Sequence, residues 1–209
     1  MSQPGANCPN CGASIAFRWP GSVQTVCTFC KSVLIRTGID LEKVGKVADL
    51  PPSASPVQIG TEGSFAGRSF VVIGRIVYEY DEGNWNEWHL MMNDGADGWL
   101  SDAQMEYCVT FPAKPEKLPR ECRPGQQYTW QGQTYTVSAI TKAHYYGVEG
   151  ELPFQTWDRS DVVFIDLMSH SGKFATIDYS EDPPLLYLGE AVEFDDLKLK
   201  NLRSFEGWS

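Results

Sequence analysis

The chain reads Gly60-Thr-Glu-Gly-Ser-Phe65-Ala-Gly67-Arg-Ser-Phe70-Val-Val72-Ile-Gly74, and 65 positions later Gly125-Gln-Gln-Tyr-Thr-Trp130-Gln-Gly132-Gln-Thr-Tyr135-Thr-Val137-Ser-Ala139. Glycine matches glycine and aromatic matches aromatic along both stretches without a gap. Further on, residues 94–100 resemble residues 169–175, which changes the offset to 75 and indicates an insertion in the second copy. These matches predict two related structural units, residues 58–118 and residues 119–209.

Each unit has the pattern of an all-β fold. Short apolar segments are separated by glycine-containing turns, as at residues 81–84 and 94–98. Strand periodicity predicts one shared face for Phe70, Val72, Ile76, Tyr78 and Tyr80, and another for Trp88, Leu90 and Met92. Strands of this number and length predict a small barrel or sandwich of SH3-like size in each unit.

A metal site is predicted upstream of the repeats. The sequence contains Cys8-Pro-Asn-Cys11-Gly12 and Cys27-Thr-Phe-Cys30. Each Cys-x-x-Cys pair places two thiolates on one tight turn, and two facing turns close a tetrahedron around an ion at about 2.3 Å per sulfur. We therefore predict a zinc ribbon over residues 1–39, in which Cys8, Cys11, Cys27 and Cys30 hold one structural Zn²⁺ ion.

Three other uses of these cysteines remain open from the sequence. They are a thioredoxin-like redox pair, disulfide bonds, and an iron site of rubredoxin type, which takes the same four thiolates. Within the ribbon we expect a hairpin of residues 15–19 and 23–26, with residues 32–36 as a third strand. Residues 40–57 are predicted to be a linker that begins with a short helix and ends in a Pro/Ser run.

The distribution of charge bears on partners. Residues 1–39 hold three basic and no acidic residues, a charge of +3. Because the net charge of the chain is −10, the remaining residues carry −13. An acidic body repels phosphates and anionic lipid, so we expect neither nucleic-acid binding nor membrane insertion. The first residues have neither the basic nor the apolar segment of a secretory signal, which favours the cytoplasm.

The segment Asn84-Trp85-Asn86-Glu87-Trp88-His89 is the richest in functional groups. Alternation along a strand would place Trp85, Glu87 and His89 on one face and Asn86 and Trp88 on the other. Ring faces beside a carboxylate suit a cationic or sugar ligand, so the candidate ligand-binding residues are Trp85, Glu87, Trp88 and Trp99. The alternative is that one tryptophan fills the core while another packs against the neighbouring unit.

These motifs together resemble the bacterial family called domain of unknown function 4178. The resemblance rests on Phe65-Ala-Gly-Arg-Ser-Phe70, Gly83-Asn-Trp-Asn-Glu-Trp88 and Gly98-Trp-Leu100. It implies an N-terminal Cys-Pro-x-Cys-Gly ribbon, a duplicated domain and no established enzymatic activity. It also implies a link to membrane-stress, polyamine-synthesis or potassium-channel functions. The second copy departs from the pattern, because Gly150-Glu-Leu-Pro-Phe154 stands where the Trp-rich strand should be.

The sequence favours a non-enzymatic cytoplasmic adaptor or scaffold, in which the ribbon is fixed by zinc and the β units present a surface to a protein partner. The alternative is a module that binds a cation or polyamine at the aromatic and acidic site of the first repeat. The sequence contains no Gly-x-Ser-x-Gly, phosphate-binding glycine loop or His-Glu-x-x-His motif, so no catalytic residue is assigned. An enzyme that uses carboxylates alone ranks third.

Overall fold

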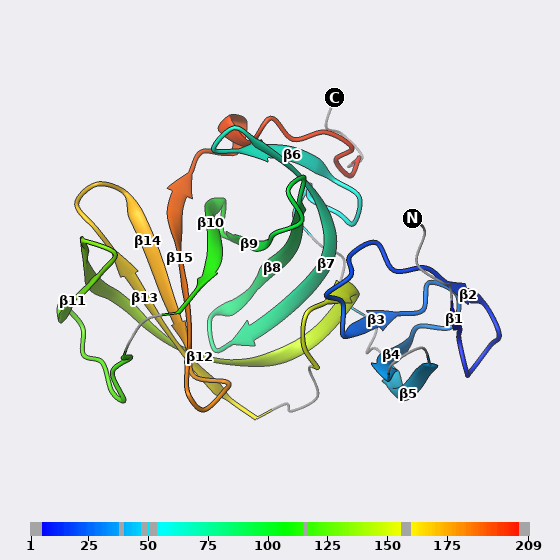
Figure 1. Ribbon diagram of the computed structural model, residues 1–209. Coiled ribbons are helices and arrows are strands. Elements are labelled where there is room, and N and C mark those ends of the chain that lie inside the picture. Colours follow the sequence, from blue (N-terminus) through cyan, green and yellow to red (C-terminus); the bar gives the residue numbers. More distant parts are fainter. Residues whose placement is uncertain are drawn as a thin grey trace.

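The computed structural model describes residues 6–37, 40–46, 50, 54–114, 117–155 and 160–204. Within these residues the secondary structure is strand, apart from the short 3₁₀ helix η1 (Phe194–Leu197), so the all-β prediction is confirmed (Figure 1). No helix in these ranges is long and apolar enough to cross a membrane.

Eight strands form a closed antiparallel barrel. Each strand pairs with its neighbours around the ring, and the last strand pairs with the first. Going round, the order is β7 (Arg68–Tyr80), β8 (Gly83–Met92), β9 (Asp97–Ala103), β10 (Glu106–Ala113), β15 (Leu185–Val192), β14 (Lys173–Asp178), β13 (Val162–Met168) and β12 (Gln133–Leu152). A barrel of eight strands has an interior that side chains fill or that holds one small ligand.

The barrel is made from two five-stranded meanders. The first begins with β6 (Glu62–Phe65) and continues through β10; the second begins with β11 (Gln127–Trp130) and continues through β15. They do not form two separate small barrels, as the sequence led us to expect, because β7 pairs with β12 and β10 pairs with β15. A separate meander would leave β7 and β10 with unpaired edges, and the joined ring pairs both.

The backbones of the two meanders match at the offset seen in the sequence. Gly60 and Gly125 both have positive φ, at 89° and 78°. The turns that follow β6 and β11 take positive φ at Ala66-Gly67 and at Gln131-Gly132. A β-bulge lies at residues 72–74 of β7 and at residues 137–139 of β12, again 65 residues apart. A common origin of the two meanders remains a prediction, and this likeness supports it.

A β-bulge in β7 divides the residues that were expected to share one face of the strand. One extra residue between Val72 and Gly74 reverses the direction of all later side chains. Phe70 and Val72 therefore pack in a core outside the ring, whereas Ile76 and Tyr78 face its interior. The shared face of Trp88, Leu90 and Met92 is confirmed, and all three lie in the same outer core as Val72.

The offset of 75 residues between the later matching segments is wrong. In the β8–β9 turn, Gly95 N donates to Met92 O, and in the β13–β14 turn Gly172 N donates to Ser169 O. These equivalent bonds lie 77 residues apart, not 75. The structural equivalent of Trp99 is therefore Thr176, and that of His89 is Asp166, which are again cross-strand pairs in each meander.

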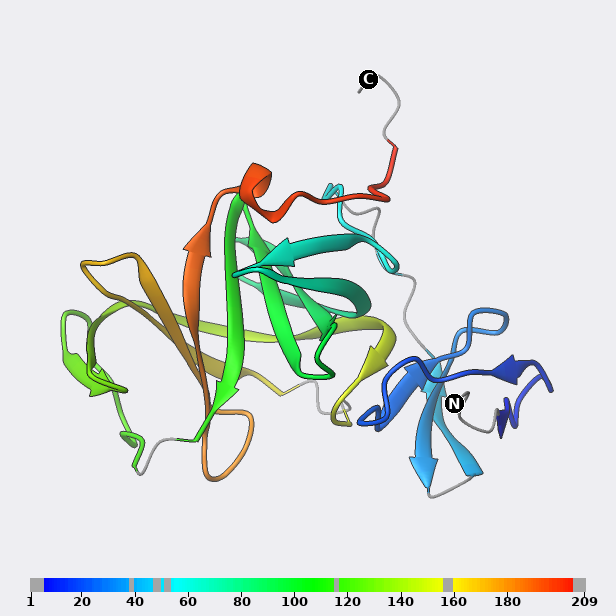
Figure 2. The same ribbon diagram turned by 45° about the horizontal axis from the view of Figure 1, so that its top comes forward.

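Two hydrophobic cores lie outside the ring, one on each meander, and different segments cover them. The first is closed by β6 and the C-terminal segment, which lie close together (Figure 2). Leu197 is buried there, and Glu62 bridges to Lys200. The second is covered by β11 and by residues 118–122, with Tyr128 and Trp130 packed against Tyr135. These covers bury part of the outer face of the ring, so a strand such as β8 has buried side chains on both faces, Trp88 on the outer and His89 on the inner.

The described part of the ribbon contains five short strands. They are β1 (Ala6–Asn7), β2 (Ser14–Ile15), β3 (Gln24–Val26), β4 (Ser32–Thr37) and β5 (Asp40–Lys46). The expected third strand is β4, but the hairpin of residues 15–19 with 23–26 is wrong, because β2 pairs with β1 and β3 with β4. The short helix is also wrong, since residues 40–46 pair with β4 as strand β5. Much of the expected Pro/Ser run lies outside the described residues.

Candidate functional site

The four ribbon cysteines come together on two equivalent turns. In the first turn Gly12 N donates to Cys8 O, and in the second Lys31 N donates to Cys27 O. Both donors have positive φ, 76° at Gly12 and 57° at Lys31, so the second turn adopts without glycine the conformation that Gly12 takes in the first. The two turns face each other and direct their thiols to one point.

The sulfur positions fit a tetrahedral metal ion. The Sγ atoms of Cys8 and Cys30 are 3.6 Å apart, and those of Cys11 and Cys27 are 3.7 Å apart. An ion held at about 2.3 Å from each of four sulfurs requires edges of about 3.8 Å. All four atoms lie within 4.8 Å of one another, so these residues can hold a metal ion, with no ligand position left open for catalysis.

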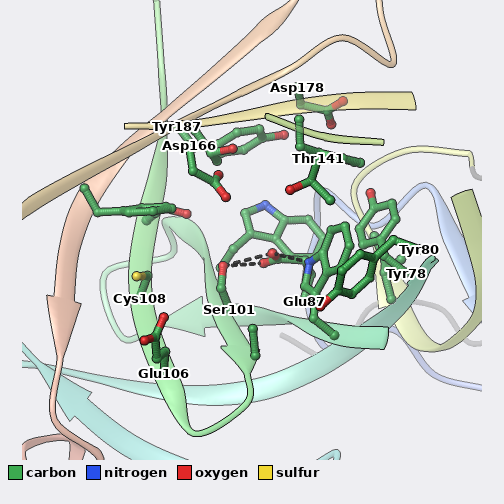
Figure 3. A pocket seen from close by; sticks show the side chains of 18 of the residues that line it. Tyr78, Tyr80, Glu87, Ser101, Glu106, Cys108, Thr141, Asp166, Asp178 and Tyr187 are labelled. Carbon is green, nitrogen blue, oxygen red and sulfur yellow. Dashed lines mark hydrogen bonds between the residues drawn. The ribbon is translucent and has the colours of Figure 1, made fainter. Parts of the chain in front are cut away.

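A second candidate site is the interior of the barrel. A cavity of about 470 Å³ lies there, and all eight ring strands contribute to its wall (Figure 3). Its described lining includes eight aromatic side chains and five carboxylates, and no lysine, arginine or histidine among these residues. The carboxylates are Glu82, Glu87, Glu106, Asp166 and Asp178. Pockets of roughly 300–1,000 Å³ are typical for small-molecule ligands.

Glu87 is held in the cavity wall by two donors. Trp85 Nε1 donates to its carboxylate at 3.0 Å, and Ser101 Oγ lies 2.8 and 2.9 Å from its two oxygens (Figure 3). Burial nevertheless raises the pKa of Glu87 from 4.5 to about 8, since the hydrogen bonds only partly offset the loss of water. At neutral pH this group is therefore mostly protonated.

Two aspartates face the same cavity from the second meander. Burial raises the pKa of Asp166 from 3.8 to about 6, against the lowering effect of a hydrogen bond from Thr176. Burial also raises the pKa of Asp178, while the backbone and side chain of Ser180 lower it. Asp166 thus carries most of a negative charge at pH 7, in a cavity whose described wall supplies no positive charge.

The wall also carries the thiol of Cys108. Burial raises its pKa to about 12, and the neighbouring charge of Glu87 adds to the effect. The thiolate is the reactive form, so Cys108 is inert at neutral pH.

The structure separates the four predicted ligand-binding residues. Trp85, Glu87 and Trp99 line the cavity. Trp88 points to the opposite face, where it is fully buried in the first outer core and the guanidinium of Arg75 lies 4.9 Å from its ring centroid. Trp85 also packs edge-on against Phe164 of the second meander, so packing between the units, the alternative reading, is likewise observed.

Asp166 and Asp178 were missed by the sequence analysis. The signal that could have found them is an acidic residue inside an apolar strand, as in Val162-Val-Phe-Ile-Asp-Leu-Met168 and Phe174-Ala-Thr-Ile-Asp178. Charged residues rarely occupy such positions without a partner or a function.

The cavity carboxylates do not form a metal site. Over the part of the chain that the structure describes, the four cysteines are the only group of three or more such ligands within 4.8 Å of one another. The acidic groups are instead spread over several strands of the wall. This spacing suits a ligand larger than a single ion.

Fold and sites together define the class: an all-β barrel protein with a four-cysteine ribbon and an acidic, aromatic cavity. A family model described as "Domain of unknown function (DUF4178)" matches residues 58–194, and the chain belongs to this family. The match contains the whole ring and both covering strands. Searches of curated proteins and of solved structures gave no significant match.

Proposed function

We propose that the barrel binds a small organic cation in its cavity. The observation that carries this proposal is the lining: aromatic rings and carboxylates from all eight strands, and no basic side chain among the described wall residues. Ring faces and a desolvated carboxylate both favour a cation over a neutral or anionic ligand. The spread of the acidic groups favours a molecule with amines at more than one position, such as a polyamine.

Asp166 and Glu87 have different roles in this proposal. Asp166, mostly ionised at pH 7, attracts the first ammonium group. Glu87 is mostly protonated in the free protein, and a nearby positive charge lowers its pKa, so an ammonium group at Glu87 releases a proton. Cation binding is then accompanied by proton release and strengthens as the pH rises from 6 to 8.

The test is calorimetric titration with 1,4-diaminobutane and with butane-1,4-diol, a neutral compound of matched length. We expect the diamine to bind and the diol not to bind. Asp166→Asn should weaken diamine binding at least tenfold, whereas Glu106→Gln, which neutralises an exposed carboxylate at the same cavity, should change it less than threefold. Equal binding of diamine and diol, or no diamine binding at millimolar concentration, would overturn the proposal.

We propose that zinc is the ion of the ribbon and that its role is structural. Four thiolates at tetrahedral spacing support zinc, although iron accepts the same ligands. A cytoplasmic location belongs to the same proposal, because a reducing compartment keeps the four thiols available to the metal.

The adaptor role is a second candidate, and one observation favours it. Phe29, on the second cysteine turn, leaves 77% of its surface exposed. A large aromatic side chain at the tip of a metal-fixed turn can anchor a protein partner. The test is affinity purification from the native cell: a partner retained by the wild type and lost by metal-loaded Phe29→Ser supports this role, and equal retention contradicts it.

A further inference from the structure

The ribbon is joined to the barrel by a buried carboxylate. Glu151, near the end of β12, is 5% exposed, and its side chain accepts hydrogen bonds from Arg18 N at 2.8 Å, Trp19 N at 3.2 Å and Ser22 Oγ at 2.5 Å. The backbone of Glu151 pairs with Thr25 of β3, so β12 continues into the sheet of the ribbon. A charged group that satisfies three donors in a buried joint fixes the position of the ribbon.

A chain of ring contacts runs from this joint to the cavity. The ring of Trp19 meets His89 edge-on at 5.2 Å, and His89 packs on Trp99 at 5.0 Å. Trp99 in turn stacks on Phe154 at 5.8 Å, and these last two residues line the cavity. Trp19 belongs to the ribbon, so a ribbon side chain stands two contacts away from the ligand space.

His89 connects the two ends of this chain. Its side chain is fully buried, and Nδ1 donates to the carbonyl oxygen of Glu151 at 2.9 Å. The other ring nitrogen, Nε2, has no hydrogen-bond partner among the described residues and lies 3.8 Å from a carboxylate oxygen of Asp97. The ring is therefore held by one hydrogen bond and by the two tryptophans on its sides, and loss of Trp19 would free one side.

The second meander carries different residues at the equivalent positions. The equivalents of His89 and Trp99 are Asp166 and Thr176, which also pair across two strands and line the open cavity. The first meander thus carries bulky rings, which Trp19 of the ribbon contacts, where the second meander carries small polar groups. The ring-filled wall coincides with the ribbon contact.

We infer that the metal ribbon supports the cavity wall at Trp99, so that metal binding in the ribbon and ligand binding in the barrel strengthen each other. This inference depends on the proposed function only for the identity of the ligand. Because coupling between two binding sites is reciprocal, the factor by which metal raises ligand affinity equals the factor by which ligand raises metal affinity.

The first experiment needs no ligand. The full chain is labelled with 5-fluorotryptophan, and the ¹⁹F resonances are assigned by single Trp→Phe variants. Removing the metal with a chelator should shift the resonance of Trp99 and leave that of Trp130, which stacks on Tyr128 in the second meander, unchanged. An unchanged Trp99 resonance would overturn the inference, whether or not any amine binds.

The second experiment measures the coupling. Affinity for 1,4-diaminobutane should fall at least fivefold on metal removal, at the lower end of typical couplings, and zinc affinity should rise by the same factor when the diamine is present. Trp19→Ala should keep its zinc and reproduce the loss of diamine affinity, while Val44→Ala, at an exposed position of β5, should behave as wild type. Wild-type diamine affinity in zinc-loaded Trp19→Ala would overturn the inference. Absence of diamine binding to the metal-loaded wild type would instead refute the proposed function.

Discussion

Replacing Glu87 with glutamine should stabilise the protein, and the gain should grow with pH. Burial in the cavity wall raises the pKa of this carboxyl from 4.5 to about 8. Between these values the folded state holds a proton that the unfolded state has released, so stability falls as the pH rises. Glutamine resembles the neutral acid: its oxygen can accept from Trp85, and its amide can donate to the hydroxyl of Ser101.

The size of the effect follows from the shift. A change from 4.5 to about 8 corresponds to about 5 kcal/mol of lost stability above pH 8, at 1.36 kcal/mol per pKa unit. About 2 kcal/mol of this is already lost at pH 6. The difference in unfolding free energy between Glu87→Gln and the wild type should therefore increase by about 3 kcal/mol from pH 6 to pH 9.

The assay is urea unfolding of metal-loaded protein, followed by circular dichroism at pH 6, 7, 8 and 9. Glu106→Gln is the matched control, because it neutralises an exposed carboxylate at the same cavity and should stay within about 0.5 kcal/mol of wild type throughout. A stability difference for Glu87→Gln that stays constant from pH 6 to pH 9 would refute the assignment of a buried, mostly protonated carboxyl.

Three other outcomes are expected. Protein purified without added metal should contain about one equivalent of zinc, which Cys8→Ser or Cys27→Ser should lose; iron in the wild type, or zinc retained in both variants, would contradict the assignment. Glu151→Gln should lower the unfolding free energy by about 2 kcal/mol in urea, because it removes charge-assisted bonds to Arg18 N and Trp19 N, and a change below about 0.5 kcal/mol would argue against a fixed joint. The full chain, with net charge −10, should not bind mixed DNA or RNA with submicromolar affinity at about 0.15 M salt in a filter-binding assay, and such binding would speak against the charge argument.

Local features of this protein are readable from its sequence, because the residues that create them are neighbours in the chain. The cysteine turns depend on two residues between thiols and on the backbone of the next residue, and the structure brings all four sulfurs together. The turns after β6 and β11 likewise depend on adjacent residues, Ala66-Gly67 and Gln131-Gly132. Alternation correctly separated Trp85 and Glu87 from Trp88.

The joined barrel was not predicted because it depends on pairs between distant strands. Glu79 pairs with His144 and Phe111 pairs with Leu188, and no local pattern states which edges will meet. The bulge after Val72 has a similar cause, since one unpaired residue is set by the partner strand as much as by its own sequence. Both meanders line the cavity, so the segment around Glu87 indicated only the part of the wall that the first meander forms.

Strand β12 has a consequence for how the chain becomes a folded protein. This one strand of 20 residues pairs with β3, β7, β11 and β13, so it joins the ribbon to both meanders. On the ribosome, β7 and β10 are made before their later partners, so the edge of β7 stays open until β12 is made and the edge of β10 stays open until β15 is made. An unpaired strand edge can pair with a strand of another chain, and pairing between strands that are far apart in the sequence is slow. The barrel thus passes through an aggregation-prone stage that ends only with synthesis of β15, and truncation after residue 114 would make that stage permanent.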